Sequence, residues 1–260
     1  MELFWVSLAA LLASCLTFFS GFGLGTLLMP VVALFLPVEV AIAVTAIVHL
    51  ANNLLKWALV GKKVDRSVQS VLWRFGAPAV LAALLGAWLL NMLSGLPTLF
   101  EYQWLGREFA VSVVKFIIGV LILAFVWLEL SPRFANMSFD ARYLPLGGAL
   151  SGFFGGLSGH QGAFRSMFLL KSGLDSQRFI ATGVVLAVLV DVARMLVYGW
   201  NFSASTAHIQ WTMVLSASFS AFVGAYLGAQ LLHKVTLRTI QRLVSVLLVL
   251  IGLGLVTGLL

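Results

Sequence analysis

Charged residues are scarce in this sequence. Of its 260 residues only 10% are Asp, Glu, Lys or Arg, whereas 61% are hydrophobic; soluble chains carry about 25% charged residues. The mean hydropathy is +1.06, and a soluble globule of this size would need more polar surface than such a chain contains. The surplus apolar surface must therefore face lipid, which excludes a soluble enzyme or binding domain.

Cysteine is almost absent as well. The single Cys15 excludes an internal disulfide and any multi-cysteine metal site. The chain also lacks an H-E-x-x-H element, so neither a metal nor another cofactor is expected. No basic residue precedes the first apolar run, and this run is therefore expected to be a membrane segment and not a cleaved signal peptide.

Long apolar runs dominate the rest of the chain. They cover residues 3–19, 24–36, 38–60, 68–93, 109–130, 143–157, 163–170, 179–200, 209–232 and 240–260. Helices satisfy every backbone amide inside lipid, and these runs are too long for alternating barrel strands. We therefore expect an all-α integral membrane protein. Four runs are short and form two pairs, each interrupted by a glycine cluster, at residues 21–25 and 152–162.

The two interrupted pairs belong to an internal repeat. A shift of 138 residues aligns 20–90 with 158–228 without a gap, and a fixed offset of this kind is typical of duplication. The aligned identities include Ser20 with Ser158, Gly21 with Gly159, Trp73 with Trp211 and Gly86 with Gly224. The pattern predicts two repeats of about five helical segments each, at residues 1–130 and 143–260, joined by a cytoplasmic linker at 131–142.

Basic residues change ends between the two repeats. Ten basic residues of the connections are expected on the same side of the membrane: Lys62, Lys63, Arg66, Arg133, Arg142, Lys171, Arg178, Lys234, Arg238 and Arg242. Arg107 is left on the other side. If the basic connections are cytoplasmic, both termini lie outside and the repeats have inverted topology. Because these residues mark one membrane face, the net charge of +7 is no sign of nucleic acid as a partner.

Inverted repeats with interrupted helices are typical of secondary transporters, which hold their ligand near the middle of the bilayer. A helix that begins inside the membrane presents unpaired N–H groups and the positive end of its dipole, and so favours an anion. The second helix of each pair is expected to begin near Thr26 and near Ala163. We therefore expect a small anionic substrate at Gly23, Gly25 and Thr26 and at the second glycine break.

The first break also carries a family motif. Residues 21–30, G-F-G-L-G-T-L-L-M-P, and the L-P-x-x-x-A step at 36–41 resemble the elements that open each half in the TauE/SafE family of sulfite and organosulfonate transporters, also called the toluene sulfonate uptake permease family. Leu24 replaces the middle glycine of the motif, and Phe168 stands where the second half would have its proline. The resemblance spans essentially the whole chain.

The resemblance implies a multi-pass protein of the bacterial inner membrane. Its substrate would be sulfite, sulfoacetate or a related organosulfonate, or a related carbon anion. Transport would be by alternating access and driven by an ion gradient, with a proton or sodium ion as the coupling partner.

The second break keeps only part of the family pattern and has gained His160, Gln161 and Arg165. The guanidinium fork of Arg165 matches sulfonate, sulfite or carboxylate oxygens; alternatively, it supports the site indirectly or extends to the inner face. His160 could donate to the anion or carry a coupling proton, since its unperturbed pKa is about 6.5, or it could bond a loop carbonyl. Ser158 is a candidate donor that could equally bond its own helix.

A polar stripe follows the third run. His49, Asn52, Asn53 and Lys56 share one helical face, and polar residues on an apolar helix are expected to face the bundle interior. We place His49, Asn52 and Asn53 in the substrate site and expect Lys56 to extend to the inner surface. At the repeat offset, Asn53 and Lys56 match Asp191 and Arg194. These two form either a neutralising pair or a coupling or gating element.

Other functions were weighed against the carrier. An intramembrane enzyme could use His160, Arg165 and Asp191, but the chain has no G-x-S-x-G nucleophile element, and we do not expect an enzyme. A channel-like anion pore and a carrier of a small carboxylate share the same sequence features and stay open as alternatives.

Overall fold

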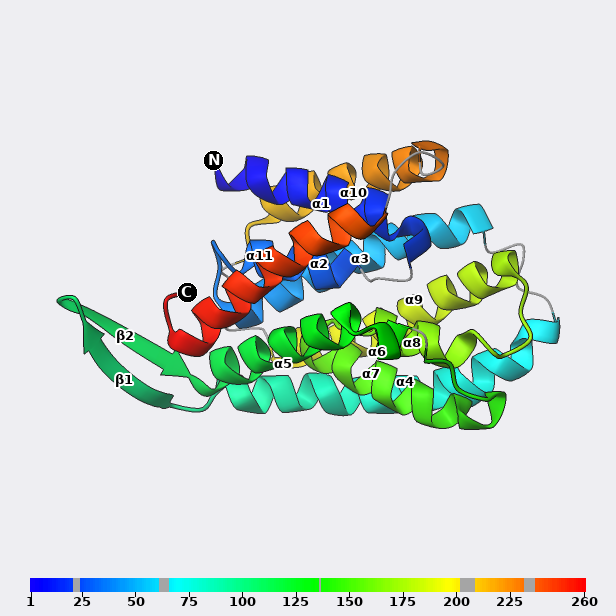
Figure 1. Ribbon diagram of the computed structural model, residues 1–260, viewed down its shortest axis with the longest axis horizontal. Helices are drawn as coiled ribbons and strands as arrows, with labels where there is room; N and C mark the ends of the chain where they lie inside the picture. Colours follow the sequence, from blue (N-terminus) through cyan, green and yellow to red (C-terminus); the bar gives the residue numbers. More distant parts are fainter. Residues whose placement is uncertain (21–23, 61–65, 136, 202–208, 232–236) are drawn as a thin grey trace.

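The computed structural model describes residues 1–260 except 21–23, 61–65, 136, 202–208 and 232–236 (Figure 1). Its helices are α1 (Glu2–Ser20), α2 (Leu24–Val32), α3 (Val38–Val60), α4 (Arg66–Ser94), α5 (Val113–Leu130), α6 (Pro132–Ala135), α7 (Leu144–Ser158), α8 (Gly162–Leu169), α9 (Ser176–Asn201), α10 (Trp211–Leu231) and α11 (Leu237–Thr257), with a 3-10 turn at Ala141–Tyr143. The expected all-α architecture is confirmed.

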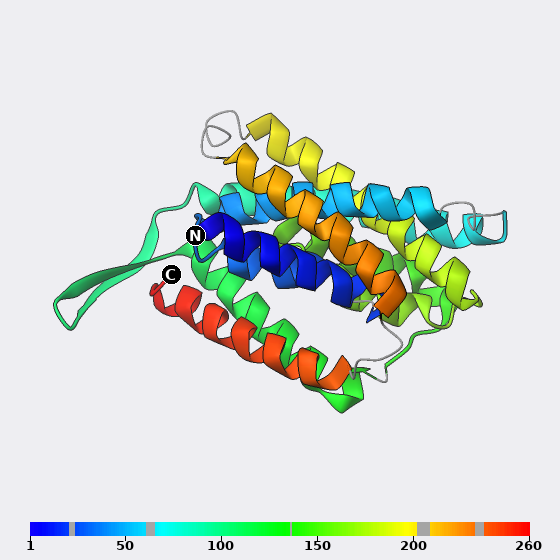
Figure 2. The same ribbon diagram turned by 90° about the horizontal axis from the view of Figure 1, so that it is seen from above.

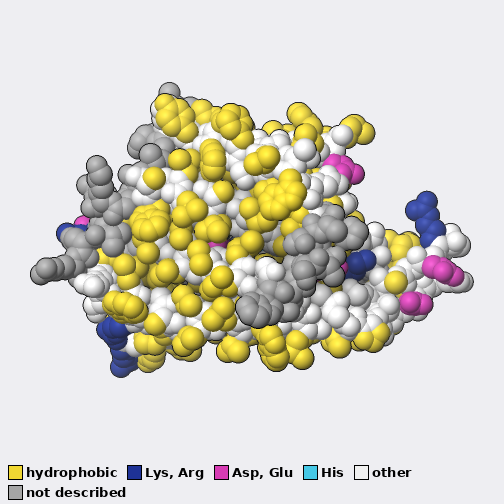
Figure 3. Space-filling model, turned by 180° about the vertical axis from the view of Figure 1, so that it is seen from behind, with side chains coloured by type: hydrophobic (Ala, Val, Ile, Leu, Met, Phe, Trp, Pro, Cys, Tyr) yellow, Lys and Arg dark blue, Asp and Glu magenta, His cyan; other side chains and the backbone are white. Residues whose placement is uncertain are grey.

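Five of these helices are long and apolar enough to cross a membrane: α3, α4, α5, α9 and α10. Many of their large apolar side chains are exposed, among them Trp73, Leu196 and Phe219, which are about two-thirds accessible. On the face shown in Figure 3, apolar side chains cover most of the middle of the molecule, whereas Lys and Arg gather mainly towards its ends. This distribution is that of a multi-pass membrane protein, whose surface meets lipid.

A β-hairpin interrupts the helical pattern between α4 and α5. Strand β1 (Thr98–Trp104) pairs antiparallel with β2 (Arg107–Ser112), so the predicted helix over 109–130 begins four residues late. Leu105 and Gly106 form the turn with φ of 50° and 73°, the geometry of a two-residue hairpin turn. The hairpin extends beyond the helical body (Figure 2), and the hydroxyl of Tyr102 anchors it by donating to the Thr257 carbonyl.

Both termini and the hairpin lie at one end of the molecule, and the connections from α6 to α7 and from α8 to α9 lie at the other (Figures 1 and 2). Those connections contain Arg142 and Lys171, two members of the predicted cytoplasmic set. Lys62, Lys63 and Lys234 lie outside the described residues, as do the side chains of Arg66, Arg238 and Arg242. The orientation in the membrane stays a prediction.

Helices from the two ends of the chain pack in matching pairs. α4 lies along α7, and α1 lies along α10. α5 packs against α11, and α3 packs against α9 (Figures 1 and 2). Under the 138-residue offset, α1 corresponds to α7, α4 to α10 and α3 to α9, so the α1–α10 contact repeats the α4–α7 contact, and the α3–α9 contact pairs two corresponding helices. The duplication itself stays a prediction.

Glycines bring α4 and α7 into backbone contact. A Cβ atom on Gly148 would lie 2.1 Å from the Phe75 carbonyl oxygen, and one on Gly152 would lie 2.0 Å from that of Ala79. Gly156 meets α4 in the same way. Small residues at four-residue spacing let membrane helices approach this closely. The predicted break at 152–162 is therefore too long: its first part is helical, and the interruption narrows to residues 159–161.

Replacing Gly152 with Ala is expected to destabilise the protein by about 1–3 kcal/mol, the usual cost of overpacking. The added methyl group would meet the Ala79 backbone, which can move away only if α4 and α7 separate. Thermal unfolding in detergent measures the effect. Gly199→Ala is the matched control, since no heavy atom of the described residues would lie within 4 Å of its Cβ. Equal melting temperatures of the two variants would contradict this packing.

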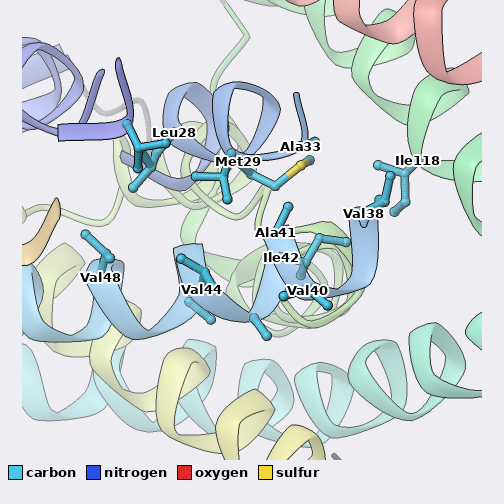
Figure 4. Packing of buried hydrophobic residues seen from close by; sticks show 14 of the residues in the cluster. Leu28, Met29, Ala33, Val38, Val40, Ala41, Ile42, Val44, Val48 and Ile118 are labelled. Carbon is cyan, nitrogen blue, oxygen red and sulfur yellow. The ribbon is translucent and has the colours of Figure 1, made fainter. Parts of the chain in front are cut away.

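The apolar core fixes the position of α2. Leu28 and Met29 of α2 face Ala41 and Val44 of α3, and Ile118 of α5 lies nearby (Figure 4). Leu28, Ala41, Val44 and Ile118 are fully buried. Burial of these side chains stabilises the short α2 helix, which at nine residues is too short to be stable alone. Its amino terminus is thereby held against α3, inside the bundle.

Candidate substrate-binding site

The two glycine breaks meet inside the bundle. A Cβ atom on Gly25, at the start of α2, would lie 3.3 Å from the Gly159 carbonyl oxygen and 3.8 Å from the Thr45 methyl carbon of α3. Gly159 ends α7 in the left-handed region, with φ of 83°, a conformation that costs glycine little. The expected convergence of the two breaks is confirmed for these residues, and α3 lies beside them.

Asp191 of α9 lies at the centre of a buried polar cluster. Its side chain is fully buried, and four side chains contact its carboxylate. Oδ2 is 2.6 Å from His49 Nδ1 and 3.3 Å from Asn53 Nδ2. Oδ1 is 2.7 Å from Arg194 Nη2 and 3.1 Å from Gln161 Nε2. Asp191 thus joins α3, α9 and the second break.

The ionised carboxylate of Asp191 fixes the hydrogen positions around it. It only accepts hydrogen bonds, so His49 Nδ1 and Gln161 Nε2 carry the hydrogens. His49 Nε2 then accepts from Asn53 Nδ2 at 3.3 Å. Gln161 turns its oxygen the other way and accepts from Arg165 Nη1 at 3.2 Å. Gln161 therefore links the buried acid to Arg165, which is half-buried.

Arg194 forms the predicted pair with Asp191, and both side chains are at most 1% exposed. Its Nη1 also donates to the Gly155 carbonyl at 3.3 Å. One turn later, the Tyr198 hydroxyl donates to the Gly156 carbonyl. α9 is thus tied to the last turn of α7. Tyr198 was missed by the sequence analysis, although its four-residue spacing from Arg194 places it on the same helical face.

His160 lies in the second break and is 3% exposed. Its Nδ1 is 3.0 Å from Ser158 Oγ and 3.2 Å from the Ser158 carbonyl oxygen, so the loop-carbonyl bond is confirmed. The ring stacks on Phe125 of α5, with centroids 4.8 Å apart and planes at 10°. Contact with substrate and a proton-carrying role stay predictions.

Several buried polar atoms around this junction have no hydrogen-bond partner among the described residues. They are Thr45 Oγ1, Asn52 Nδ2, His160 Nε2 and Arg194 Nε. The great majority of buried polar atoms in proteins are paired, so this group is unusual. Thr45 and Asn52 lie on the same face of α3 as His49. The Asn52 oxygen accepts from Ser14 of α1 at 3.2 Å, which leaves its amide hydrogens for another acceptor.

The structure brings together most of the predicted site residues. Gly25 and Thr26 are buried in the first turn of α2, whereas Gly23 lies outside the described residues. The expectation for Lys56 is wrong: its side chain is 7% exposed, and it lies inside the bundle. His49 and Asn53 of the polar stripe contact Asp191 of α9, whereas Asn52 bonds Ser14 of α1.

Positive charge exceeds negative charge in this cluster. The described residues bury two basic side chains, Lys56 and Arg194, against one acidic side chain, Asp191. Arg165 adds a further positive charge beside Gln161. An excess of positive charge among buried side chains in a region of low dielectric favours an anion. Electrostatics and unpaired hydrogen-bond donors therefore select the same kind of ligand.

Comparison with known proteins agrees with this geometry. The family model described as sulfite exporter TauE/SafE matches residues 6–255. Searches of curated proteins and of solved structures give no match. Because the family match covers nearly the whole chain, together with both glycine breaks and the polar cluster between them, the chain belongs to the TauE/SafE family of membrane transporters.

Proposed function

We propose that this protein is a secondary transporter that binds a small sulfur oxyanion in the buried polar cluster and carries it across the membrane by alternating access. The substrate is sulfite, sulfoacetate or a related organosulfonate. The observation that carries the proposal is a group of buried polar atoms without partners among the described residues, Thr45 Oγ1, Asn52 Nδ2 and Arg194 Nε. Thr45 lies beside Gly25, at the amino terminus of α2. Sulfonate and sulfite oxygens supply the acceptors that these donors lack.

The predicted repeat supports this location. Asn53 and Asp191 are 138 residues apart, the repeat offset, and they contact each other at 3.3 Å. Two equivalent residues can touch only close to the axis that relates the repeats. Transporters built from inverted repeats bind their substrates at such an interface. On this proposal, residues 1–130 and 143–260 are the two repeats, and residues 131–142 are the cytoplasmic linker.

The distribution of basic residues supports the orientation. The connections that contain Arg142 and Lys171 lie opposite both termini (Figure 1). With those connections in the cytoplasm, both termini and the β-hairpin lie outside the bacterial inner membrane. An ion gradient drives transport, and Asp191 and Arg194 couple or gate the movement.

Purified protein in liposomes tests the proposal directly. We expect saturable exchange of radiolabelled sulfite, sulfoacetate or isethionate that responds to an imposed gradient. Taurine and simple carboxylates complete the panel. An ohmic anion current would contradict the carrier in favour of a pore. Exchange of carboxylates alone would contradict the sulfur oxyanion.

Thr45→Val is expected to weaken substrate binding without destabilising the protein. The change keeps the side-chain shape and removes a hydroxyl that has no partner among the described residues. A lost bond to a charged ligand is worth about 1.5–3 kcal/mol, which corresponds to roughly a ten- to hundredfold rise in KM. The initial rate of exchange against substrate concentration measures it.

Thr182→Val is the matched control. Thr182 is equally buried, but its hydroxyl donates to the Arg178 carbonyl at 2.6 Å within α9. Its loss is expected to affect stability and leave KM unchanged. An equal KM for the two variants would remove Thr45 from the site.

A further inference from the structure

Among the described residues, the two buried histidines differ in whether they can accept a proton. His49 uses both ring nitrogens: Nδ1 donates to Asp191, and Nε2 accepts from Asn53. Adding a proton to His49 would break the bond from Asn53. The carboxylate of Asp191 is engaged by four side-chain donors, so protonating it would also break bonds that the structure holds.

The tautomer of neutral His160 follows from its neighbours. A carbonyl oxygen only accepts hydrogen bonds, so the Ser158 carbonyl, 3.2 Å away, receives a hydrogen from His160 Nδ1. The Ser158 hydroxyl donates its hydrogen to the Phe154 carbonyl at 3.1 Å. The hydroxyl oxygen of Ser158 therefore also accepts from His160 Nδ1, at 3.0 Å. The hydrogen of the neutral ring is therefore on Nδ1.

Nε2 of the neutral His160 ring then carries a lone pair. This atom is buried and has no hydrogen-bond partner in the described part of the chain, and a buried polar atom without a partner is costly. The ring itself is held firmly, since Phe125 stacks on its face. An aromatic face also attracts a positive charge. Nε2 can therefore take a proton without losing any bond.

The charges around His160 oppose that proton unless an anion is present. The charged or titratable side chains on the surrounding helices are Glu39, His49 and Lys56 of α3, Lys115 and Glu129 of α5, Arg165 of α8, and Arg178, Asp191, Arg194 and Tyr198 of α9; α2 and α7 contain none. Arg194 lies close, because its Nη1 would be 3.2 Å from a Cβ on Gly159, the neighbouring residue. Its positive charge repels an imidazolium, and an anion bound beside both removes the repulsion.

We propose that the substrate anion is carried together with one proton, which binds Nε2 of His160. This inference rests on the proposed function and names its coupling ion. On the loading side, the Nε2 lone pair takes a proton from water, and the new N–H group donates to an oxygen of the anion. On the release side, the anion leaves, the N–H bond breaks and the proton returns to water. Each ligand favours the other's binding, which is the thermodynamic condition for coupled transport.

Proton uptake on binding tests the inference in weakly buffered detergent solution. The probe is isethionate, whose sulfonate stays ionised throughout the pH range used. Adding it to the wild-type protein at about pH 7.5 is expected to take up about one proton per bound anion, seen as alkalinisation by a pH dye. In protein with 15N-labelled histidine, one ring is expected to change from the Nδ1–H tautomer to imidazolium. Isethionate binding with no proton uptake would overturn the proposal.

Liposomes with an internal pH dye give the second readout. A proton gradient is expected to drive isethionate accumulation in the wild type, with about one proton moved per anion. In His160→Gln, the proton-to-anion ratio is expected to fall at least tenfold, whatever its rate of exchange, and the imidazolium signal is expected to disappear. A wild-type ratio in His160→Gln, or accumulation driven by sodium alone, would overturn the assignment.

The wild-type measurements separate this inference from the function on which it rests. If the protein exchanges none of the sulfur oxyanions, the proposed function fails. If it exchanges them without moving protons, the function stands and only the proton site fails.

Discussion

Asp191→Asn is expected to abolish transport and to destabilise the protein by about 3–5 kcal/mol, the usual cost of breaking a buried ion pair. Asn keeps the size of the side chain but removes its charge, and an amide nitrogen replaces one accepting oxygen. Arg194, 1% exposed, would keep a positive charge without its partner. One of the side chains that now donate to the carboxylate would meet an N–H group instead of an acceptor. Thermal unfolding and liposome exchange measure the two effects.

The chain contains a matched control for this pair. Asp175 and Arg178 form the same i,i+3 arrangement at the start of α9, but their side chains are 58% and 41% exposed and the charged atoms are 3.5 Å apart. Exposed pairs contribute about 0–1 kcal/mol, and Asn caps a helix as well as Asp does. Asp175→Asn is therefore expected to leave stability and transport close to wild type. Equal effects of the two substitutions would contradict a structural role for the buried cluster.

Arg165→Ala is expected to raise the KM for the sulfur oxyanion at least a hundredfold while the protein still inserts and folds. Arg165 is half-buried, and its Nη1 donates to Gln161, which leaves the rest of the guanidinium able to donate to a ligand. A forked contact between guanidinium and sulfonate is stronger than a neutral hydrogen bond and specific in geometry. Arg165→Lys keeps the charge but loses the fork, and is expected to restore only part of the affinity.

Arg178→Ala is the control, because Arg178 pairs with Asp175 at the surface. Binding isotherms and exchange rates for the four proteins, compared at equal reconstitution, separate a ligand contact from a general effect of positive charge. A wild-type KM in Arg165→Ala would remove Arg165 from the substrate site and leave Thr45, Asn52 and Arg194 as its donors.

The helices could be predicted from the sequence because each is a long apolar run, and lipid permits few other structures. The β-hairpin could not. Its residues 98–112 combine aromatic side chains with a short Leu105-Gly106 turn, and the apolar residues of β2 continue directly into α5. The hairpin is stabilised by contacts that the pattern of apolar residues in the sequence does not indicate. They include the stacking of Tyr102 on Phe109 and the hydrogen bond from Tyr102 to Thr257.

The candidate site was predictable where it depends on local spacing. The Asp191–Arg194 pair and the shared face of His49 and Asn53 follow from helical periodicity. The contact between His49 and Asp191 does not, because 142 residues separate them and only tertiary packing brings α3 against α9. The burial of Lys56 was missed for the same reason: a basic residue near a helix end extends to water only if no other helix covers it.

The backbone contact between α4 and α7 limits how this transporter can move. α4 comes from residues 1–130 and α7 from residues 143–260, and α1 and α10 cross between the same two parts of the chain. Rocking one part against the other as two rigid bodies would pull apart the close backbone contacts of Gly148, Gly152 and Gly156 with α4. If transport proceeds by the proposed alternating access, α4 and α7 are therefore expected to move together, and each moving unit would contain helices from both parts of the chain.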